Sequence, residues 1–234
     1  MKLRKLGNTD LLVSEIGFGT WTIATNWWGQ ADDPSDMLKT AFDCGINFYD
    51  TAPAYGDNGL GETIMADFIK EHKDEIIVTT KCGYDIHAER PKEHSERPHN
   101  WSRDSIISQT EDSLERLGLE TIDLMQLHNI RLDAVENDEL FETLDDLVEQ
   151  GKIRYYGVSL GPVIGWENEG MISLDKRNIV SLQTVYNALE QEPSKTFMKH
   201  QKCIDGSVSM ISRVPHASDS LSGKVTRENL DDMF

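Results

Sequence analysis

Short runs of apolar residues alternate with longer segments of helical periodicity along most of the chain. The runs are rich in β-branched residues and too short for helices, which is typical of buried parallel strands. After a first run at residues 13–17, they occur at 46–49, 76–80, 122–127, 153–158, 179–182 and 208–211. This pattern predicts seven parallel strands that are joined by crossover helices.

The segments between the runs carry the apolar stripes of amphipathic helices. One stripe consists of Leu140, Phe141, Leu144, Leu147 and Val148. A second stripe follows Ser102, a suitable N-cap residue, and consists of Ile106, Ile107, Leu114 and Leu117. The opening residues KLRKLGNTDLLVSEIG predict a small hairpin that turns at Gly7 and Asn8.

A (β/α)8-type barrel, an α/β fold, fits this regular alternation best, and residues 1–234 are expected to form one domain. The alternative is an open, doubly wound sheet. That fold usually carries a G-x-G-x-x-G turn after its first strand. The nearest match, GFGT at residues 17–20, lacks this spacing.

Composition narrows the classes of function. The 41 acidic and 23 basic residues give a net charge of −18, which disfavours binding to nucleic acids. The three cysteines show no C-x-x-C spacing, so neither disulfides nor a zinc site is expected. The histidines of the loop 87–101 (His87, His94 and His99) are irregularly spaced, and no metal site is expected there. With no membrane span and no secretion signal, we expect a cytosolic protein.

Polar residues follow the apolar runs at the carboxyl ends of six predicted strands. In chain order they are Asp50, Lys81, His128, Ser159, Gln183 and Arg213. The carboxyl ends of barrel strands surround one mouth, where barrel enzymes hold their active sites. We therefore expect these side chains to meet.

Tyr55 lies on the loop after the second barrel strand, within INFYDTAPAYG (46–56). A neighbouring ammonium group would lower the pKa of its phenol, and Lys81 can supply that charge. Asp50 would keep Lys81 protonated, and His128 could orient a bound carbonyl group. These four residues suggest a device for proton transfer to a carbonyl oxygen.

Reduction of a carbonyl also requires a hydride, which no side chain can deliver, so a nicotinamide cofactor is implied. Ser159 and Gln183 carry groups that can hold a carboxamide. The planar guanidinium of Arg213 could stack on the nicotinamide ring.

The sequence resembles the aldo-keto reductase family over essentially its whole length. The matching motifs are GFGTW (17–21), INFYDTAPAYG (46–56), TTK (79–81), LHN (127–129), KIRYYGVS (152–159), QTVYN (183–187) and SRVPHASDSLSGK (212–224). The resemblance implies reduction of aldehydes or ketones, with Tyr55 as general acid, Asp50 and Lys81 as its activators and His128 as the substrate orienter. The expected cofactor is NADP, with NAD as the alternative. The implied cofactor-binding residues are Gly19, Thr20, Trp21, Asp50, Ser159, Gln183, Arg213, Pro215, Ser218 and Lys224.

The substrate is expected to be a small carbonyl compound that contacts Trp21, Trp27, Tyr55 and His128. Trp28 and Trp101 also fall in loops near the expected mouth, where aromatic walls suit apolar or planar substrates, although one or two of these tryptophans could simply cap the barrel. The oligomeric state stays open.

Three features depart from the family pattern. Leu160 replaces an asparagine, Asp219 a glycine and Ser220 a bulky apolar residue. The chain also ends at Phe234, within the expected loop after the seventh strand, so we expect the eighth strand and last helices to be absent. The alternative function is therefore a cofactor-binding but catalytically inactive regulatory or interaction protein on the same scaffold.

Overall fold

The computed structural model describes residues 1–25, 33–89, 95–161, 165–224 and 226. Within this part of the chain, one sheet contains seven parallel strands that are hydrogen-bonded in sequence order. They are β3 (Phe18–Gly19), β4 (Phe48–Asp50), β5 (Ile77–Cys82), β6 (Ile122–His128), β7 (Ile153–Ser159), β8 (Ser181–Val185) and β9 (Ser209–Arg213). Six of the seven predicted runs thus lie in or beside the strands predicted from them, with boundaries that differ by at most three residues.

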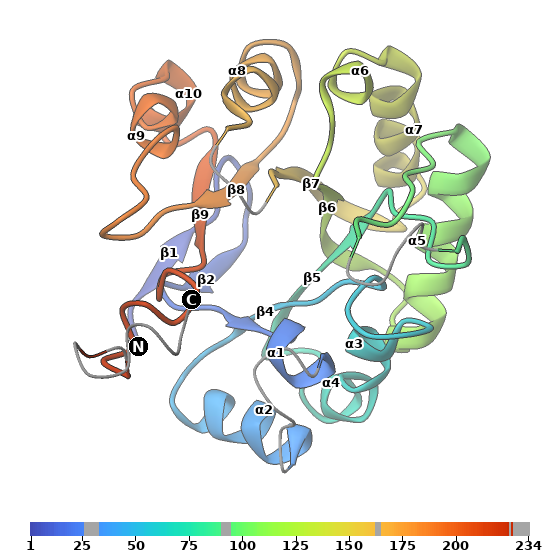
Figure 1. Ribbon diagram of the computed structural model, residues 1–234. Coiled ribbons are helices and arrows are strands. Elements are labelled where there is room, and N and C mark those ends of the chain that lie inside the picture. Colours follow the sequence, from blue (N-terminus) through green and yellow to red (C-terminus); the bar gives the residue numbers. More distant parts are fainter. Residues whose placement is uncertain (26–32, 90–94, 162–164, 225, 227–234) are drawn as a thin grey trace.

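Helices lie on the outside of the curved sheet and surround its strands (Figure 1). The longer helices are α2 (Pro34–Asp43), α4 (Ala66–His72), α5 (Arg103–Leu117), α7 (Asp138–Glu149) and α8 (Glu167–Lys176). Short helices lie between them: α1 (Trp21–Ala24), α3 (Leu60–Thr63), α6 (Leu132–Val135), α9 (Ser194–Phe197) and α10 (Gln201–Ile204). Both predicted amphipathic helices are confirmed as α5 and α7, because their apolar stripes are buried against the strands.

The predicted hairpin is also confirmed, as β1 (Leu3–Lys5) paired antiparallel with β2 (Leu12–Ser14). Gly7 in its turn has φ +53°, and a Cβ there would lie 2.2 Å from the carbonyl oxygen of Val180. Only glycine fits this close approach to the sheet. The hairpin therefore packs against the sheet at the start of the neighbouring strands.

The prediction of a barrel strand at residues 13–17 was wrong. Val13 pairs with Arg4 inside the hairpin, and the first strand of the parallel sheet is β3, which pairs with β4. The start of this run joined the hairpin because Val13 buries its side chain with Leu6 and Leu11, whereas Ile16 is exposed. A short apolar run has the same sequence pattern in a hairpin strand as in a barrel strand, so the pattern does not distinguish them.

The order of the strands decides between the two fold classes. An open doubly wound sheet reverses its strand order at a switch point, whereas here each strand neighbours the next one along the chain. The curved parallel sheet with outer helices confirms an α/β fold of the (β/α)8-barrel type, of which the described residues form seven strands. Among the described residues, β3 and β9 form the two edges of the sheet.

Two large clusters make up most of the apolar core of the described residues, and a small third one surrounds Tyr55. The larger cluster fills the space between the strands and the helices and includes Tyr49, Met125 and Leu144. The smaller cluster lies between the hairpin and the inside of the sheet and consists of Leu6, Leu11, Val13, Phe48 and Leu124. No helix of the described residues is long and apolar enough to cross a bilayer.

Candidate active site

Lys81 lies near the carboxyl end of β5 and is completely buried. Its Nζ donates hydrogen bonds to Oδ1 of Asp50 and, at 2.9 Å, to the carbonyl oxygen of Thr51. Burial alone would lower the pKa of this amine. Attraction to Asp50 and Tyr55 and hydrogen bonds to the same two residues outweigh burial, so the pKa of Lys81 lies above its ordinary value. The buried amine is therefore a stable cation.

Asp50, the last residue of β4, is the centre of a network of side chains. While Oδ1 accepts from Lys81, Oδ2 accepts from Nε2 of Gln126 at 2.9 Å and from Nε2 of Gln183 at 3.0 Å. Gln126 also donates to Oγ1 of Thr79 at 2.9 Å. The carboxylate is thus fixed from three other strands, β5, β6 and β8.

Tyr55 lies on the turn after β4 and packs over the amine. The Nζ of Lys81 is 4.9 Å from the centre of its ring. The ring also meets the imidazole of His128 edge to face, with centroids 5.7 Å apart. The structure therefore brings together Asp50, Tyr55, Lys81 and His128, as the sequence predicted.

His128 ends β6 and is almost fully buried. Burial is the main cause that lowers its pKa well below the ordinary value, and the charges of Lys81 and Arg213 act in the same direction. The imidazole is therefore neutral at physiological pH. A neutral imidazole can donate one hydrogen bond while it accepts another.

The loop after β5 packs against His128. His99 bonds through Nε2 to the carbonyl oxygen of His128 at 3.0 Å and stacks between Tyr84 and Trp101. Trp101 thus supports the loop by stacking on His99. No group of three potential metal ligands occurs in the described ranges; His94, Trp27 and Trp28 lie outside those ranges.

The residues predicted to hold a carboxamide lie beside this network. Oγ of Ser159 donates to Oε1 of Gln183 at 2.8 Å. Since Gln183 also donates to Asp50, it connects Ser159 with the carboxylate. Arg213 ends β9 and donates to the carbonyl oxygen of Leu160 at 3.2 Å.

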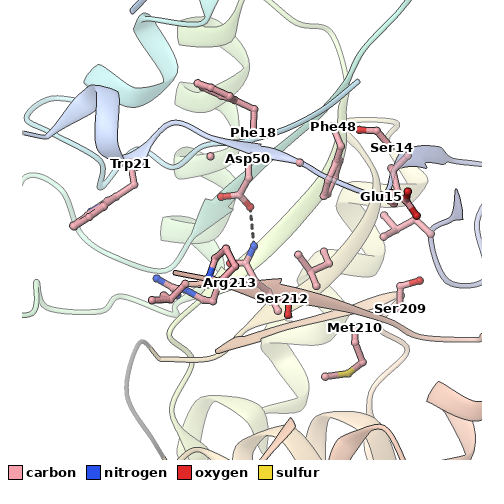
Figure 2. A pocket seen from close by; sticks show the side chains of 18 of the residues that line it. Ser14, Glu15, Phe18, Trp21, Phe48, Asp50, Ser209, Met210, Ser212 and Arg213 are labelled. Atoms are coloured by element: carbon pink, nitrogen blue, oxygen red, sulfur yellow. Dashed lines mark hydrogen bonds between the residues drawn. The ribbon is translucent and has the colours of Figure 1, made fainter. Parts of the chain in front are cut away.

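A cavity of about 1020 Å³ opens between the two edges of the sheet. Figure 2 shows Phe18, Trp21 and Asp50 on one side of it and Ser212 and Arg213 on the other. The other predicted residues that line it are Gly19, Tyr55, Gln183, Pro215 and Ser218. Lys81 and His128 are not in its lining, because they are buried behind Asp50 and Tyr55.

Two predicted cofactor residues are held by other groups of the chain. The Oγ1 of Thr20, which is buried, donates to Oγ1 of Thr51 at 2.8 Å. Lys224 does not line the cavity and pairs with Asp219 at 3.2 Å. The aspartate that replaces the family's glycine has φ +75°, a backbone conformation that favours glycine.

Sequence reasoning missed three polar residues that support the site. Gln126 holds Asp50, and the signal was present, because Leu124, Gln126 and His128 alternate on one face of β6. Asn129 donates to the hydroxyl of Tyr84 at 2.7 Å. Glu62 is completely buried behind the turn that carries Tyr55.

The cavity and its donors fit a nicotinamide group. Its volume is at the upper end of the range for small-molecule sites. A Cβ at Gly19 would meet no atom within 4 Å, so this wall is open. Gln183 lines the cavity and its amide carries both a donor and an acceptor, as a carboxamide requires, while Ser159 is buried behind it and bonded to it.

Comparison with known proteins gives a consistent result. The family model described as "Aldo/keto reductase family" matches residues 15–232. The chain is 31% identical to "Aldo-keto reductase YhdN" of Bacillus subtilis, with 97% of this chain and 66% of that protein covered. The "Uncharacterized oxidoreductase YqkF" of the same organism is 33% identical, with 96% and 68% covered.

Solved structures show the same likeness. The holo form of aldo-keto reductase AKR11C1 from Bacillus halodurans matches with a TM-score of 0.80 and 31% identity, covering 98% of this chain and 71% of that chain. The glycerol dehydrogenase AKR11B4 from Gluconobacter oxydans matches with a TM-score of 0.79 and 28% identity, covering 97% and 67%. The chain spans about two thirds of the length of its curated relatives. It belongs to the aldo/keto reductase family of oxidoreductases.

Proposed function

We propose that the chain, as one domain over residues 1–234, reduces small aldehydes or ketones to alcohols with a nicotinamide cofactor. The observation that carries this proposal is the fully buried Lys81, which is bonded to Asp50 and lies 4.9 Å from the centre of the Tyr55 ring. Burying a cation is costly unless it is paired. Here the pair keeps a positive charge beside the phenol of Tyr55, which lines the cavity.

Tyr55 is proposed as the general acid. Its hydroxyl would give a proton to the carbonyl oxygen of the substrate, and the ammonium of Lys81 would stabilise the phenolate that remains. Asp50 keeps Lys81 charged, while Gln126 and Gln183 keep Asp50 in place. The proton donor thus depends on a chain of contacts that reaches across four strands.

His128 is proposed to orient the substrate. Its neutral imidazole lies edge to face with Tyr55, so an oxygen bound near the phenol can also receive a hydrogen bond from the ring. A neutral donor adds no positive charge that would compete with Lys81. Trp21 lines the cavity and is proposed, with Trp27, as part of the substrate wall.

Ser159, Gln183 and Arg213 are proposed to hold the nicotinamide end of the cofactor. Gly19, Thr20, Trp21, Asp50, Pro215, Ser218 and Lys224 are proposed as the remaining cofactor contacts. The bound cofactor would supply the hydride for the carbonyl carbon, which balances the proton from Tyr55. NADP is proposed ahead of NAD on the family resemblance. The cytosolic location stays a prediction from the sequence.

Titration of the purified chain with NADPH and NADH, followed by tryptophan fluorescence, tests cofactor binding. Turnover of a reactive aldehyde such as 4-nitrobenzaldehyde, followed at the NADPH absorbance, then tests catalysis. We expect saturable binding and aldehyde-dependent oxidation of NADPH. Binding without turnover would refute the proposal in favour of the inactive regulatory or interaction protein, and absence of binding would refute both.

A further inference from the structure

Glu62 has an environment unlike that of the other acidic residues. The chain has 41 Asp and Glu residues, yet within the described ranges Glu62 is the only one that is fully buried. Burying a carboxylate costs free energy unless both oxygens are bonded. The proposed reaction assigns Glu62 no part, so its burial requires another explanation.

Both oxygens of Glu62 are bonded to side chains from other elements. Oε1 accepts from Oγ1 of Thr80 on β5 at 2.5 Å, and Oε2 accepts from Nε of Arg116 on α5 at 2.6 Å. Arg116 passes so close to the start of α3 that a Cβ at Gly59 would lie 2.5 Å from its side chain. The short helix α3 is therefore fastened to one strand and one long helix.

Thr80 is the direct neighbour of Lys81 on β5. Successive residues of a strand point to opposite faces of the sheet. Lys81 points into the barrel toward Asp50, whereas Thr80 points outward to Glu62. A displacement of Thr80 against α3 would thus also displace the amine.

The other end of the connection is Tyr55. Gly61, the residue before Glu62, donates its backbone N–H to the carbonyl oxygen of Tyr55 at 2.8 Å. A Cβ at Gly61 would lie 2.8 Å from the Cβ of Tyr55, so the two residues are in close contact. The position of α3 therefore fixes the backbone of Tyr55.

We propose that Glu62 is a positioning residue that ties the turn carrying Tyr55 to the strand carrying Lys81. Thr80 and Arg116 are its two anchors. This proposal rests on the proposed reaction, because the distance between the phenol of Tyr55 and the amine of Lys81 matters for catalysis only in that reaction. The bonds of Glu62 hold that separation from the outer face of the sheet, where no substrate or cofactor contact is needed.

Removal of the Thr80 hydroxyl is the sharpest test. Thr80→Val keeps the shape of the side chain but leaves Oε1 of Glu62 without its partner. Thr110→Val is the matched control, because Thr110 is equally buried and its Oγ1 donates at 2.8 Å only to the carbonyl oxygen of Ile106 in its own helix. Thr80→Ser restores a hydroxyl at the same position.

We expect kcat of Thr80→Val to fall about ten- to a hundredfold, because a small misplacement of reacting groups has effects of this size. KM and the NADPH Kd should stay near the parent values, since no binding contact is altered. Thr110→Val should keep the parent kcat, and Thr80→Ser should recover it. A kcat loss equal in the two valine variants, or no recovery with serine, would overturn the proposal.

Hydrogen exchange of the Gly61 amide separates this proposal from the proposed reaction. We expect that amide to exchange at least about tenfold faster in Thr80→Val than in Thr110→Val, because it reports local opening of the turn. If the parent shows no carbonyl turnover, the proposed reaction is refuted, and the exchange rates alone test whether Glu62 holds the turn. Equal exchange in both valine variants would overturn the role proposed for Glu62. If Thr80→Val does not fold, Glu62→Gln, which gives up the charge pairing with Arg116, enters the same two assays with the same expected directions.

Discussion

The two sides of the cavity are built in different ways. On the proton-donor side, both oxygens of Asp50 are bonded by buried side chains from β5, β6 and β8. On the cofactor side, the segment after β9 consists of turns, and Val214, Ala217, Ser218 and Asp219 all have positive φ. A central strand is fixed by neighbours on both sides, whereas an edge strand is fixed on one.

The difference shows that strand packing fixes the proton-donor side, whereas the cofactor side depends on an exposed segment at the edge of the sheet. The position of Lys81 follows from strand pairing and from the burial of its partners. The positions of Pro215 and Ser218 follow from a mostly exposed segment at the edge of the sheet. Substitutions on the proton-donor side should therefore affect stability and chemistry together, and those on the cofactor side should affect binding.

The largest effect is expected from Lys81→Met. Loss of the amine leaves Asp50 without its charged partner in the interior, which should lower the free energy of unfolding by about 3 kcal/mol. The same change removes the charge beside Tyr55, so kcat/KM should fall by at least about 100-fold. Urea unfolding and NADPH oxidation measure the two losses. A Lys81→Met variant with parent stability and parent activity would contradict the claim that the proton-donor side supports stability and chemistry together.

A smaller effect is expected from Gln126→Leu. The change removes the hydrogen bonds to Asp50 and Thr79 but keeps the lysine pair, so the free energy of unfolding should fall by about 1–2 kcal/mol. Turnover should fall by roughly tenfold, since the Asp50 carboxylate loses one hydrogen bond but keeps its pair with Lys81. Ser218→Ala, on the cofactor side, is the control and should leave stability unchanged. Equal losses of unfolding free energy in Gln126→Leu and Ser218→Ala would contradict the predicted difference between the two sides of the cavity.

Asp219→Asn tests the cofactor side. The pair with Lys224 is exposed, so the free energy of unfolding should stay almost constant. Removal of the carboxylate frees Lys224 for an anionic ligand, and the NADPH Kd should fall roughly two- to fivefold. Fluorescence titration at low and high salt measures both the gain and its electrostatic origin. Weaker binding of NADPH would indicate that Asp219 supports the segment in another way.

The last prediction concerns the pH dependence of stability. His128 has a lowered pKa in the folded state, so below the ordinary value of about 6.5 the unfolded chain binds more protons and stability falls with falling pH. His99, whose pKa is also lowered by burial, contributes in the same direction. The loss between pH 7 and pH 5 should be smaller in His128→Asn than in the parent. Thermal unfolding at both pH values checks this, and an unchanged loss would contradict it.

The sequence predicted the central strands and their polar ends well because alternation and burial act locally there. Asp50, Lys81 and His128 each close or nearly close a strand, and strand order places them at one mouth. The first barrel strand was misplaced because residues 13–17 satisfy a hairpin as well as a barrel. Glu62 gave no signal in the sequence, since its partners Thr80 and Arg116 become neighbours only after folding.

Ser102 shows a further limit of local patterns. It occupies the N-cap of α5 as predicted, but its hydroxyl donates to Oδ1 of Asn100 rather than capping the helix. The position followed from the pattern, whereas the hydrogen bond depended on a neighbour. The same holds for Gln183, whose place was predicted and whose bond to Asp50 was not.

Single-turnover oxidation of bound NADPH by 4-nitrobenzaldehyde, compared between the parent and Tyr55→Phe, tests the role of the phenol most directly. Phenylalanine keeps the ring over Lys81 and removes only the hydroxyl. We predict that the variant binds NADPH as the parent does and that its chemical step is slower by at least about 100-fold. A variant that reduces the aldehyde at the parent rate would contradict Tyr55 as the proton donor.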